Sequence, residues 1–319
     1  MMGICKQITA VLCAAVLGST ALCGCSGVQN DEETLTIVAT VYPCYDFAVQ
    51  LTEAFDLQCD VKLLLTPGGE SHSYEPSPSD VAAIQSCDLF LYIGGASEIW
   101  AEDLLETSRK NKRSLRMMDH VTPIATTHEH HEDEAHEHEH EELAEYDEHI
   151  WTSPLNAVAM VEALALELGM LSPENEQTCT ANAERLCTAL KQLDTDFRAL
   201  ADTASDKPLV FGDRFPFLYL AEEYGFPYEA AFTGCTSDTD ASAATLSTLI
   251  DTVKTKEIDT VFYLENSSQK IADAICRATG AESAMLHSCN NVTREEFESG
   301  KHFQTFMEEN LAAMREALN

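Results

Sequence analysis

The sequence predicts an α/β protein of two lobes, each a parallel sheet with flanking helices, joined by one long rigid connecting helix. Strand-like and helical patterns alternate over residues 35–118, and the same alternation resumes after residue 207. This alternation is typical of parallel sheets that are covered by helices. Between the two stretches, residues 172–204 keep a helical pattern with no glycine and with no proline after Pro173. A helix of that length, about 50 Å at the standard rise per residue, usually connects two lobes.

The first lobe is expected to span residues 35–171. Short apolar runs bounded by turn signals, such as the stretch 66–69 with its proline and two glycines, predict its strands. The expected strands are 35–41, 59–65, 88–93 and 114–118. The expected helices are 43–54, 79–86, 98–108 and 154–170.

The connecting helix is expected within residues 172–205, and the second lobe within 206–319. Ser172, Pro173 and Glu174 together form a strong helix start. Two α/β lobes joined in this way resemble a clamshell, whose cleft is the natural place for a ligand. The expected strands of the second lobe are 209–211, 228–232, 260–264 and 283–286, and its expected helices are 215–224, 241–256, 267–279 and 295–318.

Residues 1–24 have the features of a lipoprotein signal peptide. Lys6 precedes an apolar run over residues 8–22 that is too short to remain as a membrane-spanning helix. The run ends in the sequence Leu-Cys-Gly-Cys, which resembles a bacterial lipobox and makes Cys25 the expected lipidation site. Residues 25–34 would then tether the folded lobes to the outer face of the membrane. The alternative is an ordinary secretory peptide in which Cys25 has no special role.

The charge balance restricts the classes of partner. The chain carries 54 acidic and 19 basic side chains, for a formal net charge of −35. Such a chain repels nucleic acids and anionic lipid surfaces, and it attracts cations. We therefore expect no nucleic-acid partner.

The cysteines do not form a recognisable zinc motif. Eight of the 12 cysteines lie beyond Cys25, and no two of these are spaced as CxxC, so a four-cysteine zinc knuckle is not indicated. Most are expected to fill small gaps in the core, although an exported chain can also form disulfides. The eight are Cys44, Cys59, Cys87, Cys179, Cys187, Cys235, Cys276 and Cys289.

Residues 128–145 interrupt the alternating pattern. The part from 128 to 140 contains six histidines and six acidic residues around the single apolar residue Ala135. With no apolar face it cannot pack, so we expect a disordered loop that captures metal weakly and exchanges it quickly. The alternative is a charged, solvated loop with no metal role. Its histidines are His128, His130, His131, His136, His138 and His140.

Three of the five remaining histidines lie where binding sites form in open α/β sheets, close to strand ends. His72 follows the strand expected over 59–65, His149 precedes the helix expected from residue 154, and His287 follows the last strand. Three imidazoles suit Zn²⁺ and leave a fourth position for a carboxylate or water. The other two, His120 and His302, are interpreted as surface residues.

Two segments carry a family resemblance. The stretch 68–80, GGESHSYEPSPSD, resembles the PHxYEPxPxD segment of zinc- and manganese-specific ABC-transporter solute-binding lipoproteins, and 147–154, DEHIWTSP, resembles their DPHxWxxP segment. Zinc members of that family carry a His-rich acidic loop at this place. The resemblance implies an extracytoplasmic lipoprotein, a monomer, that captures Zn²⁺ (Mn²⁺ is less expected). It would deliver the ion to a membrane permease with its cytoplasmic ATPase, and His72 and His149 would be the first two ligands.

The rest of the ligand set departs from the family pattern. The family has His or Glu after the strand that opens the second lobe, where this chain has Gly212, and His287 occupies the usual place of an aspartate ligand. The resemblance therefore implies a rearranged site of His72, His149 and His287, completed by Asp213, Glu265 or water. Glu265 matches an acid that lines the family's cleft, and it is equally well explained as an acid at a helix N-terminus.

Two cysteines follow strands at the same edge of the second lobe. Cys235 and Cys289 could form a disulfide over the site. Free thiols, or thiolates bound to the metal, are the competing interpretations.

Two other functional classes share some of these features. A secreted zinc hydrolase also uses three histidines and a water, with Glu265 as a possible base. The chain has no HExxH motif, so we expect no enzyme. A surface lipoprotein that buffers metal or mediates cell adhesion is the other alternative.

Overall fold

The structure is a computed structural model, and it describes residues 34–69, 73–107, 113–126, 146–232 and 241–318. Several predictions of the sequence fall outside these residues. They concern the signal peptide, Cys25, the tether up to residue 33, His72, the histidines of 128–145 and Cys235.

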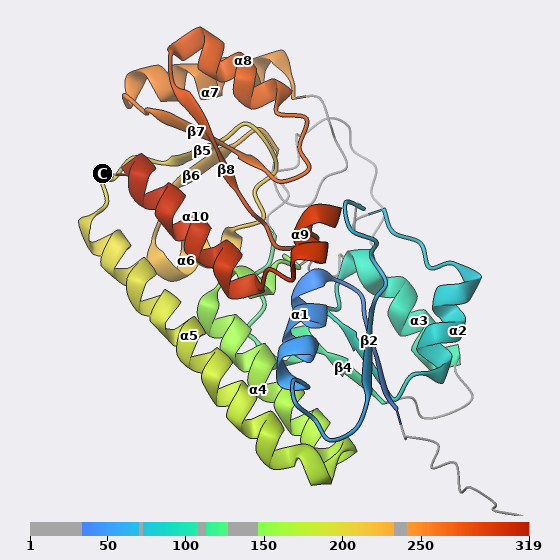
Figure 1. The fold of residues 1–319 in the computed structure, drawn as a ribbon. Coiled ribbons are helices and arrows are strands. Elements are labelled where there is room, and N and C mark those ends of the chain that lie inside the picture. The colour runs from blue at the N-terminus through green and yellow to red at the C-terminus, as the bar shows by residue number, and fades with distance from the viewer. Residues whose placement is uncertain (1–33, 70–72, 108–112, 127–145, 233–240, 319) are drawn as a thin grey trace, which may run out of the picture. The chain divides into compact units, whose positions relative to one another are not determined.

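The first sheet consists of four parallel strands in the order β2-β1-β3-β4 (Figure 1). Leu35 pairs with Cys59 on one side of β1, and Ile37 pairs with Leu89 on the other side. The three residues Ile37–Ala39 of β1 are fully or almost fully buried, as expected for a central strand covered on both faces. The strands are β1 (Leu35–Ala39), β2 (Cys59–Leu63), β3 (Leu89–Tyr92) and β4 (Ser114–Arg116).

The second sheet repeats the same topology, with four parallel strands in the order β6-β5-β7-β8. Val210 pairs with Glu229 on one side of β5 and with Val261 on the other side. In both lobes the first strand is therefore central, which places its carboxyl end at the middle of the sheet edge. The strands are β5 (Leu209–Phe211), β6 (Tyr228–Ala230), β7 (Thr260–Leu264) and β8 (Glu282–Leu286).

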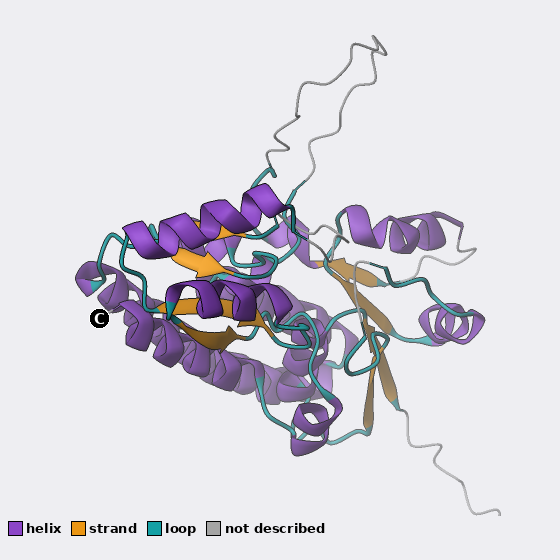
Figure 2. Ribbon diagram, turned by 90° about the horizontal axis from the view of Figure 1, so that it is seen from above, coloured by secondary structure: helices purple, strands orange, loops and turns teal. Residues whose placement is uncertain are grey.

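Helices cover both faces of each sheet (Figure 2). Apolar residues of α2 and α3 pack on one face of the first sheet, and those of α7 and α8 pack on one face of the second. The first lobe has α1 (Tyr42–Leu51), α2 (Pro78–Ser86), α3 (Ile99–Thr107) and α4 (Pro154–Leu171). The second has α6 (Leu218–Tyr224), α7 (Ala243–Thr255), α8 (Lys270–Thr279), α9 (Arg294–Ser299) and α10 (Phe303–Leu318). Short 3-10 turns are η1 (Ala96–Glu98), η2 (Met117–His120), η3 (Ile150–Thr152) and η4 (Pro173–Asn175).

The helix expected over 295–318 is in fact two helices, which corrects the sequence prediction. Thr293 and Glu296 form a reciprocal capping box that starts α9. Gly300 ends it with a φ of +68°, in the left-handed region where glycine carries no penalty. The chain then turns before α10 begins at Phe303.

The long connecting helix is present as α5 (Glu176–Thr203), preceded by the 3-10 turn η4. Its 28 residues span about 42 Å at the standard rise. Leu186, Leu190, Leu193 and Phe197 are buried along one face, at the spacing of an amphipathic helix. That face packs against α4, α1 and α10, so α5 contacts elements of both lobes (Figure 1).

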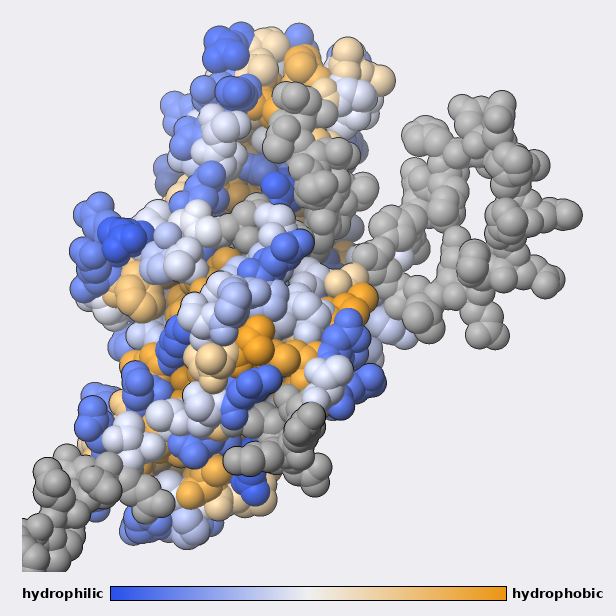
Figure 3. Space-filling view, turned by 90° about the vertical axis from the view of Figure 1, so that its right-hand side faces the viewer, coloured by the Kyte–Doolittle hydropathy of each residue, from blue (hydrophilic) through white to orange (hydrophobic). Residues whose placement is uncertain are grey.

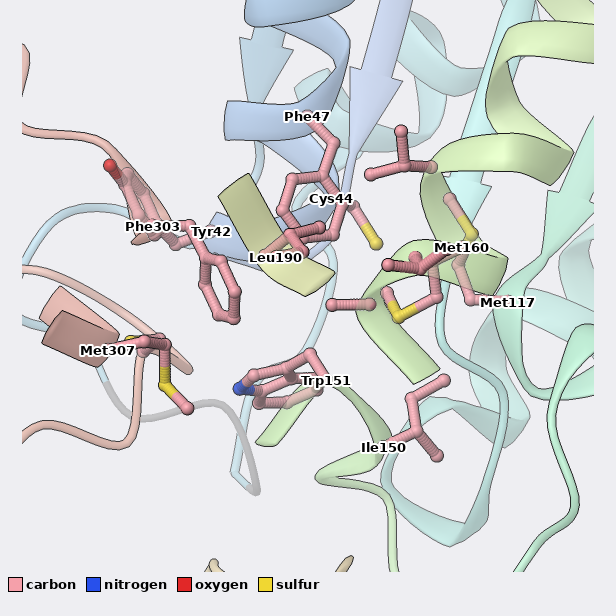
Figure 4. Close-up of a cluster of buried hydrophobic side chains, with 14 of the residues drawn as sticks. Tyr42, Cys44, Phe47, Met117, Ile150, Trp151, Met160, Leu190, Phe303 and Met307 are labelled. Atoms are coloured by element: carbon pink, nitrogen blue, oxygen red, sulfur yellow. The ribbon is translucent and has the colours of Figure 1, made fainter. Parts of the chain in front are cut away.

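One hydrophobic core extends through both lobes. Figure 4 shows Tyr42 and Phe47 of α1, Trp151 of η3, Met160 of α4 and Phe303 of α10 gathered in one cluster. Within the described residues, α4 is the one helix long and apolar enough to cross a membrane by length and composition. It packs against α5 in this shared core, as core helices of soluble proteins also do.

Candidate metal centre

A pocket lies at the carboxyl ends of β1, β2 and β3, which is where open parallel sheets bind ligands. Most of its walls come from the first lobe, and Asn290 from the loop after β8 closes one side. The residues that line it are Thr40, Val41, Leu65, Tyr74, Ile93, Ser97, Glu98, Trp100, Glu148, His149, Trp151 and Asn290.

His149 is the described histidine of this pocket, and its side chain is oriented by a buried carboxylate. Its Nδ1 lies 3.1 Å from Oδ1 of Asp147, and both side chains are at most 5% exposed. The carboxylate favours the proton on Nδ1, so the lone pair of Nε2 is the one that can coordinate a metal. A carboxylate behind a histidine in this way fixes the ring orientation and increases its basicity as a ligand.

The backbone around His149 is tightly held. The backbone N–H of His149 donates to Oδ1 of Asp147 at 2.9 Å, and its carbonyl accepts from the hydroxyl of Thr152 at 2.8 Å. The hydroxyl of Tyr219 in the second lobe donates to the carbonyl of Asp147 at 2.8 Å. The indole N–H of Trp151 donates to the carbonyl of Ser288, also in the second lobe, at 2.8 Å. The histidine is thus fixed by both lobes.

Two glutamates make the pocket acidic. Glu98 is buried and accepts a hydrogen bond from the backbone N–H of Gly94 at 2.8 Å. Burial raises the pKa of Glu98 to about 7, and the nearby Glu148 carboxylate adds to this effect. Glu148 itself accepts from the backbone N–H of Ser97 at 2.7 Å. Carboxylates in a partly enclosed site favour a cation.

The segment that carries His72 lies outside the described residues, but the chain on both sides of it lines the pocket. Leu65 precedes it and Tyr74 follows it, and both are pocket residues. The hydroxyl of Tyr74 donates to Asp80 at 3.0 Å, and Asp80 forms a capping box with Ser77 at the start of α2. Part of the YEPSPSD stretch is therefore explained by local folding.

His287 does not line this pocket. Its Nδ1 accepts a hydrogen bond from the backbone N–H of Cys289 at 3.0 Å, and its Nε2 lies 3.5 Å from Oε2 of Glu296. Its ring lies 4.1 Å from that of Phe306, between centroids. The contact with His287 is also the main cause that lowers the pKa of Glu296 to about 2. The contacts with Cys289 and Phe306 involve Nδ1 and the ring face of His287, and its role as a ligand stays a prediction.

The presence of glycine at position 212, where the family has a ligand, is explained by a lack of space for a side chain. A Cβ at Gly212 would lie 2.5 Å from the backbone N and Cα of Ala272 in α8, closer than real Cβ atoms come. A side chain that could bind a metal does not fit there. The departure from the family pattern is thus coupled to the close packing of α8 on β5.

The two carboxylates proposed to complete the site have other partners in this structure. Oδ2 of Asp213 accepts from the backbone N–H of Leu264 at 3.3 Å. Glu265 accepts from the backbone N–H of Ser288 at 2.7 Å and also from the Ser288 hydroxyl. Burial raises the pKa of Glu265. Neither Asp213 nor Glu265 lines the pocket of His149, and their roles as ligands stay predictions.

The described residues do not complete a metal site by themselves. Within residues 34–69, 73–107, 113–126, 146–232 and 241–318, no three His, Cys, Asp or Glu side chains come together as a metal-binding group. Cys289 is buried as a thiol, and because Cys235 is not described, the disulfide also stays a prediction. A site with three or more such donors at this pocket would therefore need donors from residues outside these ranges, and His72 is the one that the sequence predicts.

Sequence reasoning missed several pocket residues. Glu98 and Glu148 were overlooked because acids are common in helix starts and loops. Asn290 carries no motif of its own and lies three residues after His287, the more obvious candidate at the strand end. A usable signal was the run of polar residues from 287 to 291 directly after a strand.

A family model and individual relatives both place the chain among zinc-uptake proteins. The chain matches the family described as ZnuA, zinc-uptake complex component A, periplasmic, over residues 37–317. It is 32% identical over 311 residues to the zinc-binding lipoprotein AdcA of Streptococcus pneumoniae, with 98% of this chain but only 61% of that protein covered. It is 29% identical over 308 residues to the high-affinity zinc uptake system protein ZnuA of Bacillus subtilis, with 96% and 94% covered.

The fold is also similar to solved structures. One is the Zn(II)-bound ZnuA-like domain of Streptococcus pneumoniae AdcA, at a TM-score of 0.73 and 29% identity. The match covers 90% of this chain and 99% of that one.

Proposed function

Because the chain belongs to the ZnuA family of zinc-uptake components, we propose that it captures Zn²⁺ outside the cytoplasm and delivers the ion to an ABC importer. The observation that carries the proposal is the buried His149–Asp147 pair in the pocket at the carboxyl ends of the first sheet's strands. The pair presents an oriented imidazole to an acidic pocket that both lobes border.

Zinc capture follows from the chemistry of these groups. The negative charge of the chain attracts divalent cations to its surface. The carboxyls of Glu98 and Glu148 line the pocket, and a bound cation would favour the ionised form of Glu98, whose pKa burial raises to about 7. Nε2 of His149 then replaces a water of the ion, while Asp147 stabilises the charge that the ring acquires. His72 supplies the second imidazole from the segment between Leu65 and Tyr74. His287, Asp213, Glu265 and water are the candidates for the remaining positions.

The preferred ion is zinc rather than manganese. Imidazole nitrogen suits Zn²⁺, whereas Mn²⁺ favours oxygen ligands, and Zn²⁺ is also the stronger binder in the general order of divalent ions. The two zinc-named relatives described above support this choice. The loop 128–145 would add weaker sites that exchange metal quickly.

The proposed location is the outer face of the bacterial membrane. Residues 1–24 would be removed, Cys25 would carry the lipid, and residues 25–34 would form the tether. The partners are a membrane permease with its cytoplasmic ATPase, and the protein acts as a monomer.

The test is growth of the source bacterium under zinc limitation. Loss of the chain should slow growth in chelated medium, and the intact chain should restore growth while His149→Ala should not. Manganese limitation is the control, and growth there should be unaffected. Equal restoration by both forms would contradict the assigned site, and normal growth without the chain would instead favour a metal-buffering or adhesive role. Turnover of ester, peptide or phosphate substrates by the purified zinc-loaded protein would indicate the hydrolase.

A further inference from the structure

The segment Ser288–Val292, here called the strap, follows β8 and contacts both walls of the pocket. On one side, the carbonyl of Ser288 accepts the indole N–H of Trp151, two residues after His149, at 2.8 Å. The carbonyl of Asn290 accepts the backbone N–H of Tyr42 at 3.2 Å. The strap is therefore joined to the His149 wall and to the start of α1.

On its other side, the strap holds the turn Thr66–Gly69, which leads into the segment with His72. The side-chain amide of Asn291 donates to the carbonyls of Thr66 and Gly69, both at 2.8 Å. The backbone N–H of Gly68 donates to the carbonyl of Val292 at 2.8 Å. Three hydrogen bonds thus cross from the second lobe to this turn.

The side chain of Asn291 uses both of its amide hydrogens and its oxygen in hydrogen bonds within the protein. It is 5% exposed, both of its amide hydrogens point to the turn, and its Oδ1 accepts from the backbone N–H of Val292 at 2.8 Å. Removing the amide would leave the two carbonyls without this donor at a buried place, which is costly.

The strap is also fixed to its own lobe, so it can act as a rigid reference. Glu265 accepts hydrogen bonds from the backbone N–H and the hydroxyl of Ser288. Asn310 of α10 accepts from the backbone N–H of His287 at 2.7 Å and donates to its carbonyl at 2.8 Å. A shift of the turn relative to the His149 wall would have to break contacts with the strap.

We propose that Asn291 is a positioning residue for metal capture. By bonding the turn Thr66–Gly69 to the strap, it sets the separation between this turn and the wall that carries His149. The inference rests on the proposed function, in which the segment after the turn supplies His72. Asn291 does not touch the ion itself.

The test compares zinc binding by Asn291→Ala with that of the intact protein, both lacking residues 128–145. Loss of an outer-shell contact typically weakens metal affinity about 10–100-fold. Because Asn291 contacts the turn and not a ligand, we expect a loss at the lower end of this range, about 10-fold. The loss should come mainly through faster zinc dissociation, because the ligand types are unchanged. Asn291→Ser, which keeps one donor, covers the case in which the alanine variant does not fold, and it should fall between the two.

Asn182 provides a matched control. It is 8% exposed and its side-chain amide also donates to two backbone carbonyls, those of Leu51 and Glu53, at 3.1 and 2.8 Å. These contacts lie at the end of α1 and not at the pocket. Asn182→Ala should lower the melting temperature to a similar extent as Asn291→Ala, yet leave zinc affinity unchanged.

A second readout uses the metal-free protein. Amide hydrogen exchange at Gly68 and Gly69 should speed up in Asn291→Ala but not in Asn182→Ala. Unchanged zinc affinity in Asn291→Ala, at a melting temperature as low as that of the control, would overturn the inference. If the intact protein bound no zinc, the proposed function would fail instead, and unchanged exchange at the turn would still count against the role of Asn291.

Discussion

At the scale of single residues, the carboxylate of Asp147 is expected to set the affinity of His149 for metal. Asp147→Asn keeps an acceptor for the backbone N–H of His149, but it removes the charge that supports the imidazole. We expect zinc affinity to fall about 10–100-fold, as for other outer-shell carboxylates. Isothermal titration of the metal with the variant and the intact protein measures this, with His149→Ala as the reference for a lost ligand. An affinity equal to that of the intact protein would show that the charge of Asp147 does not support His149 as a ligand.

His302 predicts a pH-dependent contribution to stability. Its Nδ1 lies 2.8 Å from Oδ1 of the buried Asp46, which joins the start of α10 to α1. This contact is the main cause that raises the pKa of His302, with Glu53 acting in the same direction and Arg185 against it. Because the folded-state pKa is raised, the stabilisation is present at low pH and is lost as pH rises through that pKa.

The expected result is that His302→Gln lowers the melting temperature of the metal-free protein more at pH 6 than at pH 9. His120→Gln changes an exposed histidine and serves as the control, with no such difference expected. An equal loss at both pH values would mean that the Asp46–His302 contact does not depend on the charge of the ring.

The structure places two of the predicted ligands differently with respect to the pocket, and the role of each as a ligand stays a prediction. His149 was expected beside the helix that starts at residue 154, and the structure puts its side chain in the pocket. His287 was expected there because it follows a strand. In the structure its ring packs on Phe306, and its Nδ1 accepts the backbone N–H of Cys289. Contacts of this kind depend on the path of the loop after β8, which residue types do not reveal.

At the scale of elements, the close approach of α8 to the end of β5 predicts that a side chain at position 212 destabilises the fold. Gly212→Ala should lower the free energy of unfolding by about 1–3 kcal/mol, the usual range for overpacking. Denaturant unfolding of the metal-free variant measures this. Gly169→Ala is the control, because a Cβ there lies 3.4 Å from the nearest side-chain atom and alanine favours the helix. If Gly212→Ala were as stable as the control, sterics would not explain the missing ligand.

The residues next to the histidine-rich loop form a closed stem. Ala125 and Tyr146 pair in an antiparallel bridge, and the backbone N–H of Asp147 donates to the carbonyl of Ile124 at 3.0 Å. Tyr219 fastens both sides, since its hydroxyl accepts from Ile124 and donates to Asp147. Residues 128–145 can therefore be removed without cutting a helix or strand of the described fold.

Most elements could be predicted because the alternation of apolar runs and turn signals is clear. Errors occurred at boundaries where side chains pack in loops. The helix expected from residue 215 begins at Leu218, because Phe215 stacks on Tyr228 with 3.7 Å between ring centroids. The predicted helix runs across Gly300 without a break, because charged residues continue on both sides of it.

At the scale of the described unit, the two lobes share one hydrophobic core, and this restricts their movement. Contacts between α1 and α10, and those of α5 with both, could not be predicted from the sequence, which indicates only two similar lobes and a long helix.

The surface is more hydrophilic than this core. On the face shown in Figure 3, hydrophilic residues cover most of the area, with apolar residues in a band across its middle.

Zinc binding should therefore change the relative position of the lobes only slightly. α5 has no internal proline or glycine to bend it, and closure by a hinge would break the shared core. Solution X-ray scattering of metal-free and zinc-bound protein should give nearly the same radius of gyration. A closure of tens of degrees would refute the rigid connection and require a hinge elsewhere.

The most direct test of the whole account is competition between Zn²⁺ and Mn²⁺ for the purified protein without residues 128–145. We predict one tightly held equivalent of zinc that manganese does not displace and that is lost in His149→Ala. Zinc binding should also weaken below about pH 6, as imidazoles take up protons. Equal retention of both ions after dialysis, or a tight equivalent that persists in His149→Ala, would contradict zinc capture at this pocket.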